Sequence, residues 1–448
     1  MDKGLFVILG AGESGVGTAI LAQSVGYDVF VSDFGTISES YKSMLEAHQI
    51  EFEEKQHTES KILSAVEIMK SPGIPEKAPI VKAIREKNIP IVSELEFAFR
   101  YQKGKIIGIT GSNGKTTTTN LVYHIFKNEG LSVGMAGNVG VSFAYMVAKD
   151  PKDIYVLEIS SFQLDDIDKF KCDVAILLNI TPDHLDRYNY DIKNYVSSKF
   201  RITRNQTEDD ILIYCKDDEE TSAFMKENLQ NINAHLIPFS IQEKLDYGGY
   251  LDQDKIIIQT TEPTFSMLTQ EITIKGKHNH YNSLAAGIAA KSFDIKNEKI
   301  RDAFVTFKSI AHRMETVLNI HGVEYINDSK ATNVNSTWYA LESMNKEVIW
   351  IVGGVDKGND YESIKNLVKQ KVKAIVCLGV DNMKLHNEFG SIVDVMISVD
   401  NMKDAVRSSS KLAAKGDAVL LSPCCASFDL FQNYEDRGDQ FKQCVREL

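Results

Sequence analysis

KIIGITGSNGKTT, residues 105–117, decides the fold of this chain. Its first residues, 105–109, have the apolar pattern of a buried strand, and a glycine loop leads from them into a helical pattern. In such an order, backbone N–H groups wrap phosphates, a lysine reaches the β- and γ-phosphates, and a hydroxyl binds Mg²⁺. Ile109 stands where the strict GxxxxGK[ST] motif has its first glycine, and a glycine-rich turn with a solvated lysine is the alternative. We predict an ATP site made of Gly111, Ser112, Asn113, Gly114, Lys115, Thr116 and Thr117.

Apolar strand patterns recur on both sides of this loop, and helical patterns separate many of them. Those patterns lie at residues 4–9, 28–32, 89–92, 154–159, 174–178, 348–352, 374–378 and 418–421. This alternation is typical of doubly wound α/β layers. A chain of 448 residues is long enough for about three domains. We expect them at residues 1–99, 100–308 and 309–448, with a more β-rich stretch at 210–274.

Composition excludes several classes of protein. Apolar residues make up 43% of the chain and charged residues 25%, which is ordinary globular usage. The net charge of −12 argues against binding to a nucleic acid polymer. No early apolar run reaches the length of a signal sequence or membrane span. The six cysteines lack CxxC spacing, so we expect a reducing, cytoplasmic setting, with Cys424 and Cys425 as buried small residues rather than metal or redox groups.

A second glycine loop, GAGESG at residues 10–15, also follows a strand and opens a helix. Such a loop binds phosphate through free N–H groups at the helix start. With Asp33 at the end of the next strand, it fits a dinucleotide fingerprint. NAD(P) or FAD, another nucleotide-linked anion and a purely structural turn all stay open. An NAD-dependent oxidoreductase and a non-catalytic nucleotide sensor are therefore the rival classes, although no hydride-transfer partner is recognisable downstream.

Two further strands end in residues that suit a metal ion. Glu158 comes at the end of one strand, and the segment 179–188, which contains His184, follows the next. Carboxyl ends of strands in open α/β sheets share one crevice, so both should meet the loop at 111–117. Taken singly, Glu158 could be a structural acid and His184 a structural histidine. Together they predict a magnesium site beside ATP.

Several segments give the chain a resemblance to the Mur ligases that extends essentially from end to end. The segments are SPGI at 71–74, the loop at 110–117, Gly137-Asn138, residues 160–164 and 181–188, NDSKATN at 327–333 and LLSPCCASF at 420–428. The loop is also shared with folylpolyglutamate synthases, whereas NDSKATN and SPCCASF resemble the branch that adds D-glutamate. The Asp-Asn-Pro-Arg-like segment of the branch that adds a diamino acid is absent.

The resemblance implies a three-domain α/β fold: a Rossmann-like N-terminal domain, a central P-loop domain and a Rossmann-like C-terminal domain. It implies an ATP-dependent ligase that joins D-glutamate to UDP-N-acetylmuramoyl-L-alanine through an acyl phosphate, in cytoplasmic peptidoglycan precursor synthesis. Under it, we expect a monomer, and the first glycine loop holds UDP rather than NAD. The implied contacts with this substrate are Gly12, Glu13, Ser14, Gly15, Asp33, Ser71, Pro72, Gly73 and Asn138.

The resemblance also implies the rest of the site. Two Mg²⁺ ions would be served by Thr116, Glu158, His184 and a carbamate on Lys199. From the residues alone, Lys199 lies on a predicted helix at 191–203 with other basic residues, where a solvated basic face is the plainer explanation. Further ATP contacts are implied at Asn279, Arg313 and Asp328. D-Glutamate would be held by Lys330, Thr332, Lys357, Ser427, Phe428 and Tyr434.

Three positions depart from the family pattern. Tyr434 stands where a phenylalanine is expected, Val355-Asp356 precedes Lys357, and Glu13 replaces a small or apolar residue. These departures concern the expected uridine and D-glutamate pockets and not the expected metal site.

Overall fold

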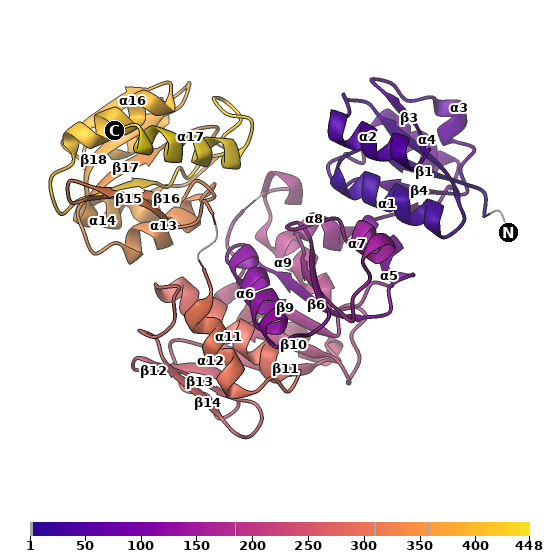
Figure 1. Ribbon diagram of the computed structural model, residues 1–448, viewed down its shortest axis with the longest axis horizontal. Coiled ribbons are helices and arrows are strands. Elements are labelled where there is room, and N and C mark those ends of the chain that lie inside the picture. The colour runs from indigo at the N-terminus through magenta and orange to yellow at the C-terminus, as the bar shows by residue number, and fades with distance from the viewer. Residues whose placement is uncertain (1–2, 184, 309–310, 357) are drawn as a thin grey trace. The chain divides into compact units, whose positions relative to one another are not determined.

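A computed structural model describes residues 3–183, 185–308, 311–356 and 358–448, whose helices and strands are labelled in Figure 1. The chain forms two compact units. Unit 1 comprises Met1–Glu271 with Tyr281–Val305, and unit 2 comprises Ile272–His280 with Thr306–Leu448. Three sheets confirm the predicted α/β class, two in unit 1 and one in unit 2. Domain boundaries near residues 99 and 308 stay a prediction.

The first sheet of unit 1 is parallel, with the strand order β3-β2-β1-β4-β5. Its strands are β1 (Leu5–Leu9), β2 (Asp28–Asp33), β3 (Glu51–Glu54), β4 (Glu67–Lys70) and β5 (Ile91–Val92). Its helices are α1 (Glu13–Ser24), α2 (Glu39–Ala47), α3 (Glu59–Ile62) and α4 (Pro79–Glu86). The order reverses between β1 and β4, which is where such sheets bind ligands. The first glycine loop and residues 71–73 follow those two strands.

The second sheet of unit 1 has nine strands in the order β14-β13-β12-β11-β10-β9-β6-β8-β7. They are β6 (Lys105–Thr110), β7 (Val133–Gly137), β8 (Ile154–Glu158), β9 (Val174–Leu177), β10 (Ile211–Cys215), β11 (His235–Ser240), β12 (Gly248–Asp252), β13 (Lys255–Gln259) and β14 (Phe265–Leu268). Strand β6 is paired in parallel with both β8 and β9. The expected β-rich stretch supplies β10–β14, whose last three strands are antiparallel.

Helices surround this larger sheet. They are α5 (Glu94–Phe99), α6 (Lys115–Asn128), α7 (Phe143–Lys149), α8 (Ser161–Asp165), α9 (Ile192–Phe200), α10 (Glu219–Asn228), α11 (Lys277–Lys291) and α12 (Asn297–Thr306). Short 3₁₀ helices lie at Leu185–Tyr188, Arg201–Thr203 and Leu229–Asn231. No helix in the described part of the chain is both long and apolar enough to cross a membrane.

Helix α5 joins the two sheets of unit 1 through two buried carboxylates. Glu94 accepts hydrogen bonds from the Ser142 hydroxyl (2.5 Å) and the Ala144 N–H (3.2 Å), both at the start of α7. Glu96 accepts from three successive N–H groups at residues 168–170, between 2.8 and 3.0 Å. Helix α1 packs against both α5 and α7. The segment expected to be a boundary is therefore a packed helix, and it brings the two glycine loops of unit 1 into one structure.

The sheet of unit 2 has the order β15-β16-β20-β17-β18-β19 and is parallel except for β15. Its strands are β15 (Glu315–Ile320), β16 (Val323–Asn327), β17 (Val348–Val352), β18 (Val372–Leu378), β19 (Met396–Val399) and β20 (Ala418–Leu421). Its helices are α13 (Val334–Ser343), α14 (Glu362–Lys371), α15 (Met383–Phe389), α16 (Met402–Leu412) and α17 (Tyr434–Arg446). The predicted strands 348–352 and 418–421 match β17 and β20 residue for residue.

Candidate functional site

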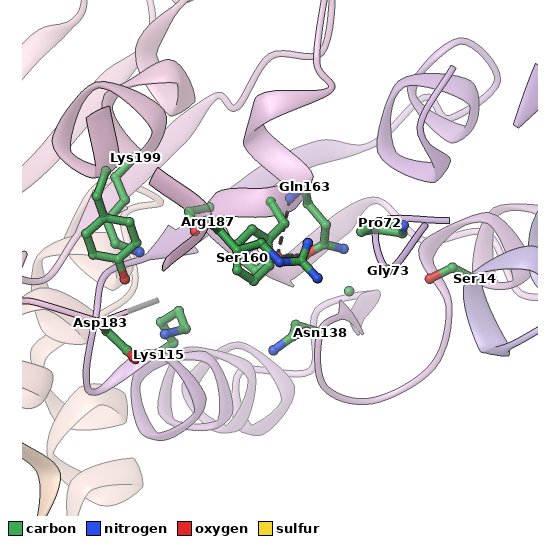
Figure 2. Close-up of a pocket in the computed structure, with 14 residues that line it drawn as sticks. Ser14, Pro72, Gly73, Lys115, Asn138, Ser160, Gln163, Asp183, Arg187 and Lys199 are labelled. Atoms are coloured by element: carbon green, nitrogen blue, oxygen red, sulfur yellow. Dashed lines mark hydrogen bonds between the residues drawn. The ribbon is translucent and has the colours of Figure 1, made fainter. Parts of the chain in front are cut away.

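A cavity of about 310 Å³ in unit 1 brings together residues from both sheets (Figure 2). Six residues that the sequence predicts for the site line it: Ser14, Pro72, Gly73, Lys115, Asn138 and Lys199. Eight other lining residues were not predicted as site residues: Gly137, Ser160, Ser161, Phe162, Gln163, Asp183, Arg187 and Tyr195. Residues beside the first glycine loop and residues of the second glycine loop therefore line the same cavity.

Left-handed backbone shapes the loop between β6 and α6. Gly114 has φ +86°, and a Cβ there would collide with the Asn282 side chain, so glycine is required at this position. Lys115 opens α6, and its Nζ donates to the carbonyl oxygens of Gly111 (2.7 Å) and Ser112 (2.9 Å). The lysine therefore lies across the mouth of the loop, where the phosphates of a nucleotide are expected.

The segment after β9 holds this loop in place. The Asn113 N–H donates to Asn179 Oδ1 (2.8 Å), and the Ser112 hydroxyl donates to the Thr181 carbonyl oxygen (2.9 Å). These bonds confirm that the loop and the segment 179–188 meet at one crevice. His184 lies outside the described residues.

Glu158 ends β8 at this crevice and is only 2% exposed. Its Oε1 accepts a hydrogen bond from Asn138 Nδ2 (3.0 Å), while the Asn138 N–H donates to the Glu158 carbonyl oxygen (2.9 Å). Its Oε2 is buried and has no hydrogen-bond partner among the described residues. A buried, unpaired carboxylate oxygen is costly unless a donor or a cation satisfies it. The residue therefore fits a metal ligand better than a helix cap.

Lys199 is buried in α9, with 1% of its surface exposed, so a solvated basic face is the wrong explanation for this residue. Its Nζ donates to the Gly111 carbonyl oxygen (2.9 Å) and lies 4.5 Å from the centre of the Tyr195 ring. Burial and the nearby Lys115 ammonium lower the pKa of Lys199 well below its ordinary value. The amine is thus shifted toward its neutral form.

The described residues contain no group of three His, Cys, Asp or Glu side chains that could hold a metal ion. The predicted ligand set includes His184, outside those residues, and Lys199, whose amine supplies an oxygen ligand only as a carbamate. Thr116, the remaining predicted ligand, is buried at the start of α6.

Most of the predicted substrate residues in and beside the first glycine loop make contacts within the protein itself. Asp33 accepts from the N–H groups of Ala11 (2.6 Å) and Gly35 (2.7 Å), so its carboxylate fixes the loop. Glu13 accepts from the Ser142 N–H (3.1 Å), and burial raises its pKa. Gly15 is needed for packing, because a Cβ there would collide with the Gly10 carbonyl oxygen. Ser14 alone of these four lines the cavity.

Ser71 packs directly against the same loop. A Cβ at Gly10, whose φ is +93°, would collide with the Ser71 hydroxyl. Gly12, by contrast, has open space on its Cβ side. The turn is therefore closed on one side and open on the other, as a phosphate-binding loop must be.

Unit 2 holds the three further residues implied as ATP contacts. Asn279 and Arg313 line one cavity of about 760 Å³. Asp328 is buried, and its oxygens accept from the Ser422 hydroxyl (2.8 Å) and the Met314 N–H (3.2 Å). Burial raises the pKa of Asp328 to about 7, against a smaller opposing effect of the Arg313 charge.

The described residues implied for D-glutamate lie on the loops after β16 and β20 and at the start of α17. Lys330 Nζ lies 5.2 Å from the centre of the Tyr434 ring, a cation–π distance. Ser427 is buried, whereas Phe428 is 71% exposed. Thr332 is half-buried, in the same loop as Lys330. Lys357 lies outside the described residues.

Arg437, a residue that the sequence analysis missed, connects three loops of unit 2, those that follow β16, β17 and β20. It is 1% exposed, and its guanidinium donates to the Ser329 hydroxyl and carbonyl oxygens (both 2.9 Å). It also donates to the carbonyl oxygens of Cys425 (3.2 Å) and Gly353 (3.5 Å). Burial lowers its pKa to about 10. The available signal was its place in the buried stripe of α17, at i, i+4 and i+8 with Phe441 and Val445.

Asp356, one of the departures from the family pattern, organises the loop that carries position 357. Its carboxylate accepts from the N–H groups of Gly358 (2.7 Å) and Asn359 (2.9 Å), from the Tyr361 hydroxyl (2.9 Å) and from Lys384 Nζ (3.1 Å). Burial raises the pKa of Asp356, but these hydrogen bonds outweigh it and hold the pKa below its ordinary value. Tyr361 also lies 3.4 Å from Cys425 Sγ, so two of the three loops are connected.

Comparison with known proteins places this site in a family. The chain matches the MurD N-terminal domain at residues 6–80, the Mur ligase middle domain at 109–290 and the Mur ligase, glutamate ligase domain at 312–425. It is 54% identical over 442 residues, 99% of each chain, to UDP-N-acetylmuramoylalanine--D-glutamate ligase of Christiangramia forsetii. It is 53% identical over 446 residues, again 99% of each, to the enzyme of that name from Bacteroides fragilis.

Solved structures show the same fold at low identity. A pseudomurein peptide ligase type C from Methanothermus fervidus has a TM-score of 0.65 at 19% identity, with 99% of each chain covered. UDP-N-acetylmuramate-alanine ligase from Thermotoga maritima has a TM-score of 0.65 at 16% identity, with the same coverage. Family domains along most of its length, and full-length relatives above half identity, show that the chain belongs to the Mur ligase family.

Proposed function

We propose that this protein is an ATP-dependent ligase that joins D-glutamate to the L-alanine carboxylate of UDP-N-acetylmuramoyl-L-alanine. Relatives that bear this activity in their names are 51–54% identical to it over 99% of its length. The observation that carries the proposal is the cavity of unit 1, which the ATP-type loop shares with residues of the first sheet. Such a cavity suits the transfer of a phosphoryl group from ATP to a nucleotide-linked substrate.

The reaction proceeds in two steps. The L-alanine carboxylate attacks the γ-phosphate of ATP, which forms an acyl phosphate and releases ADP. The amine of D-glutamate then attacks the acyl carbonyl, and phosphate leaves from the tetrahedral intermediate. Catalysis of phosphoryl transfer rests on positioning and on neutralising negative charge. Lys115, held over the loop by two carbonyl oxygens, supplies a positive charge for this purpose.

The residues present fit magnesium and a carbamate. The unpaired buried oxygen of Glu158 supports a role in binding Mg²⁺, with Thr116 as a second ligand and His184 as a third by resemblance. Carbamylation needs a neutral amine, and the lowered pKa of Lys199 supports it. When bound, two Mg²⁺ ions would neutralise charge on the phosphate oxygens. The carbamate would give Lys199 the hard oxygen that Mg²⁺ prefers.

The second substrate binds in unit 2. Lys330 with Thr332, Ser427, Phe428 and Tyr434, and Lys357 by resemblance, would hold the two carboxylates of D-glutamate. Asn279, Arg313 and Asp328 would contact ATP. The protein would act as a cytoplasmic monomer of three domains in peptidoglycan precursor synthesis. The oxidoreductase alternative is not favoured, because the first glycine loop lies within the matched MurD N-terminal domain.

Measuring ADP release tests the proposal. The purified protein receives ATP, Mg²⁺ and UDP-N-acetylmuramoyl-L-alanine, with D-glutamate, L-glutamate, D-aspartate or L-alanine as the second substrate. ADP release with D-glutamate alone is expected. Folded Lys115→Ala should lose turnover by a factor on the order of 10²–10³. ATP binding without ADP release would favour a sensor, and an NAD-dependent absorbance change without ATP would favour an oxidoreductase.

A further inference from the structure

Arg187 is a cation of the unit 1 cavity to which neither the sequence nor the family comparison assigns a role. It belongs to the 3₁₀ helix Leu185–Tyr188 and lines the cavity together with Lys115 and Pro72. In Figure 2 its guanidinium reaches into the cavity, between the P-loop residues and those of the first sheet. Among the described residues it has neither a hydrogen bond nor an ion pair.

The other two basic side chains of the cavity already have hydrogen-bond partners. Lys115 and Lys199 both donate to the Gly111 carbonyl oxygen, at 2.7 and 2.9 Å. The Arg187 guanidinium instead lies 4.7 Å from the centre of the Phe162 ring. A cation over an aromatic face is stabilised without using its N–H groups. The donors of Arg187 are therefore available to a ligand in the cavity.

Aromatic packing holds this guanidinium in a fixed place. The Phe162 ring is stacked on the Tyr188 ring, with centroids 6.1 Å apart and planes 6° from parallel. The Tyr188 hydroxyl is fixed in turn, since it donates to Asp165 Oδ2 at 2.9 Å. Side chains of α8 and of the 3₁₀ helix thus preorganise the planar fork of Arg187. Such a fork matches the geometry of phosphate and carboxylate groups, which it binds through two parallel hydrogen bonds.

We propose that Arg187 binds an oxyanion of the nucleotide-linked substrate and so determines the affinity of the enzyme for that substrate. The inference rests on the proposed function for the identity of the substrate. Two groups of UDP-N-acetylmuramoyl-L-alanine share the required chemistry, the diphosphate and the carboxylate that is activated. The cavity that Arg187 lines contains residues beside both glycine loops, where the diphosphate and the activated carboxylate are expected to bind.

Arg187→Gln is the test variant, because it removes the charge and keeps a side chain that packs on Phe162. The KM for UDP-N-acetylmuramoyl-L-alanine should rise roughly tenfold or more, as expected for a lost charge-assisted hydrogen bond. The KM values for ATP and D-glutamate should stay within about twofold. Arg187→Lys, which keeps the charge and loses the fork, should show an intermediate rise. The matched control is Arg204→Gln, since Arg204 pairs at the surface with Asp168.

Competition by UDP identifies the anion. A parallel rise in the Ki of UDP in Arg187→Gln supports contact with the diphosphate. An unchanged Ki of UDP, with a raised KM for the full substrate, supports contact with the carboxylate. An unchanged KM for the full substrate would overturn the proposal. So would equal rises for all three substrates together with a lowered Tm, which would mark a structural role.

Direct binding separates this inference from the proposed function. Calorimetric titration of wild-type protein and Arg187→Gln with UDP-N-acetylmuramoyl-L-alanine needs no turnover. If wild type releases no ADP with D-glutamate yet binds this ligand more tightly than the variant, the ligase proposal fails and the Arg187 proposal stands. If wild type turns over D-glutamate and both proteins bind the ligand equally, the reverse holds.

Discussion

The cavity of unit 1 and the loops of unit 2 use basic side chains in different ways. In unit 1, Lys115 and Lys199 share the Gly111 carbonyl oxygen and face the cavity, so their charge and chemistry remain close to a bound ligand. In unit 2, the buried Arg437 donates only to serine and backbone oxygens, while Lys330 lies over Tyr434. The two lysines serve the reaction in the first region, whereas the basic side chains of the second serve the D-glutamate loops. Substitutions of Lys115 and Lys199 should therefore affect kcat, and substitutions in the loops of unit 2 should affect the KM for D-glutamate.

The largest expected effect concerns Lys199 in unit 1. Lys199→Ala should lose activity by a factor on the order of 10² or more. It removes the proposed carbamate, and with it a ligand of the Mg²⁺ that neutralises charge in the transition state. A short added carboxylic acid should partly restore ADP release in Lys199→Ala and not in Lys199→Arg. Wild-type activity should fall when CO₂ and bicarbonate are stripped from the buffer. An active Lys199→Arg enzyme would mean that a positive charge suffices there, and the carbamate would have to be abandoned.

A smaller effect, confined to KM, is expected for Lys330 in unit 2. Lys330→Ala should raise the KM for D-glutamate about 10- to 100-fold, the range for a lost hydrogen bond between charged groups. Initial rates at varied D-glutamate and ATP would measure this, and the KM for ATP should change little. Lys369→Ala, on the exposed face of α14, is the control. A fall in kcat at unchanged KM would erase the contrast between the two units.

Asp356 allows a finer test of the same contrast. It holds the loop after β17 in shape, and it is not among the residues proposed to bind D-glutamate. Asp356→Ala removes four hydrogen-bond acceptances from the loop, although the backbone pairing of Val355 with Ala426 remains. The KM for D-glutamate should rise roughly tenfold, with kcat within about twofold of wild type. Asp356→Asn, which keeps an oxygen that can accept some of these hydrogen bonds, should have a KM for D-glutamate between those of wild type and Asp356→Ala. If both variants match wild type, the loop is held by the backbone pairing alone.

The smallest effect is on stability and depends on pH. The pKa of Asp328 is raised to about 7 in the folded protein, against 3.8 as its ordinary value. The folded state therefore binds the proton more tightly, and the contribution of Asp328 to stability falls as pH rises from about 4 to about 7. Asp328→Asn removes this dependence. Its gain over wild type in denaturant unfolding should be largest at pH 8 and should disappear near pH 4. An equal gain at both pH values would show that ionisation is not its cause.

Local sequence was enough to predict the parts of the site that lie on one loop or one strand. The P-loop, the strand β8 that ends in Glu158, and the meeting of both with residues 179–188 follow from apolar runs and glycines within short windows. Burial of Lys199 did not follow, because its helix carries other basic residues and only the contact with Gly111, 88 positions away, shows it. Arg437 was missed for the same reason, since its partner Ser329 lies 108 positions away.

Departures from a family pattern were informative in a way that a motif search is not. Val355-Asp356 reads as a deviation in the sequence, and in the structure Asp356 is the acceptor around which that loop is built. The sequence predicts a domain boundary at residue 99, and in the structure Glu94 and Glu96, just before it, are buried acceptors that join the two sheets of unit 1. The partners of Glu94 and Glu96 come from segments about 50 to 75 positions away, so no local pattern could reveal them.

The six cysteines form no disulfide, and the buried ones in each unit can report on local unfolding of that unit. Burial raises the pKa of all six; the pKa of Cys425, for example, is raised to about 11, so this thiol stays protonated at neutral pH. A protonated, covered thiol is a poor nucleophile. A buried thiol is therefore alkylated only after local unfolding, and the alkylation rate reports how often that unfolding occurs. Cys172 and Cys215 report on unit 1, and Cys377, Cys424 and Cys425 report on unit 2. The alkylation rate of each cysteine, followed by mass spectrometry with and without a substrate, therefore shows which unit that substrate protects from local unfolding.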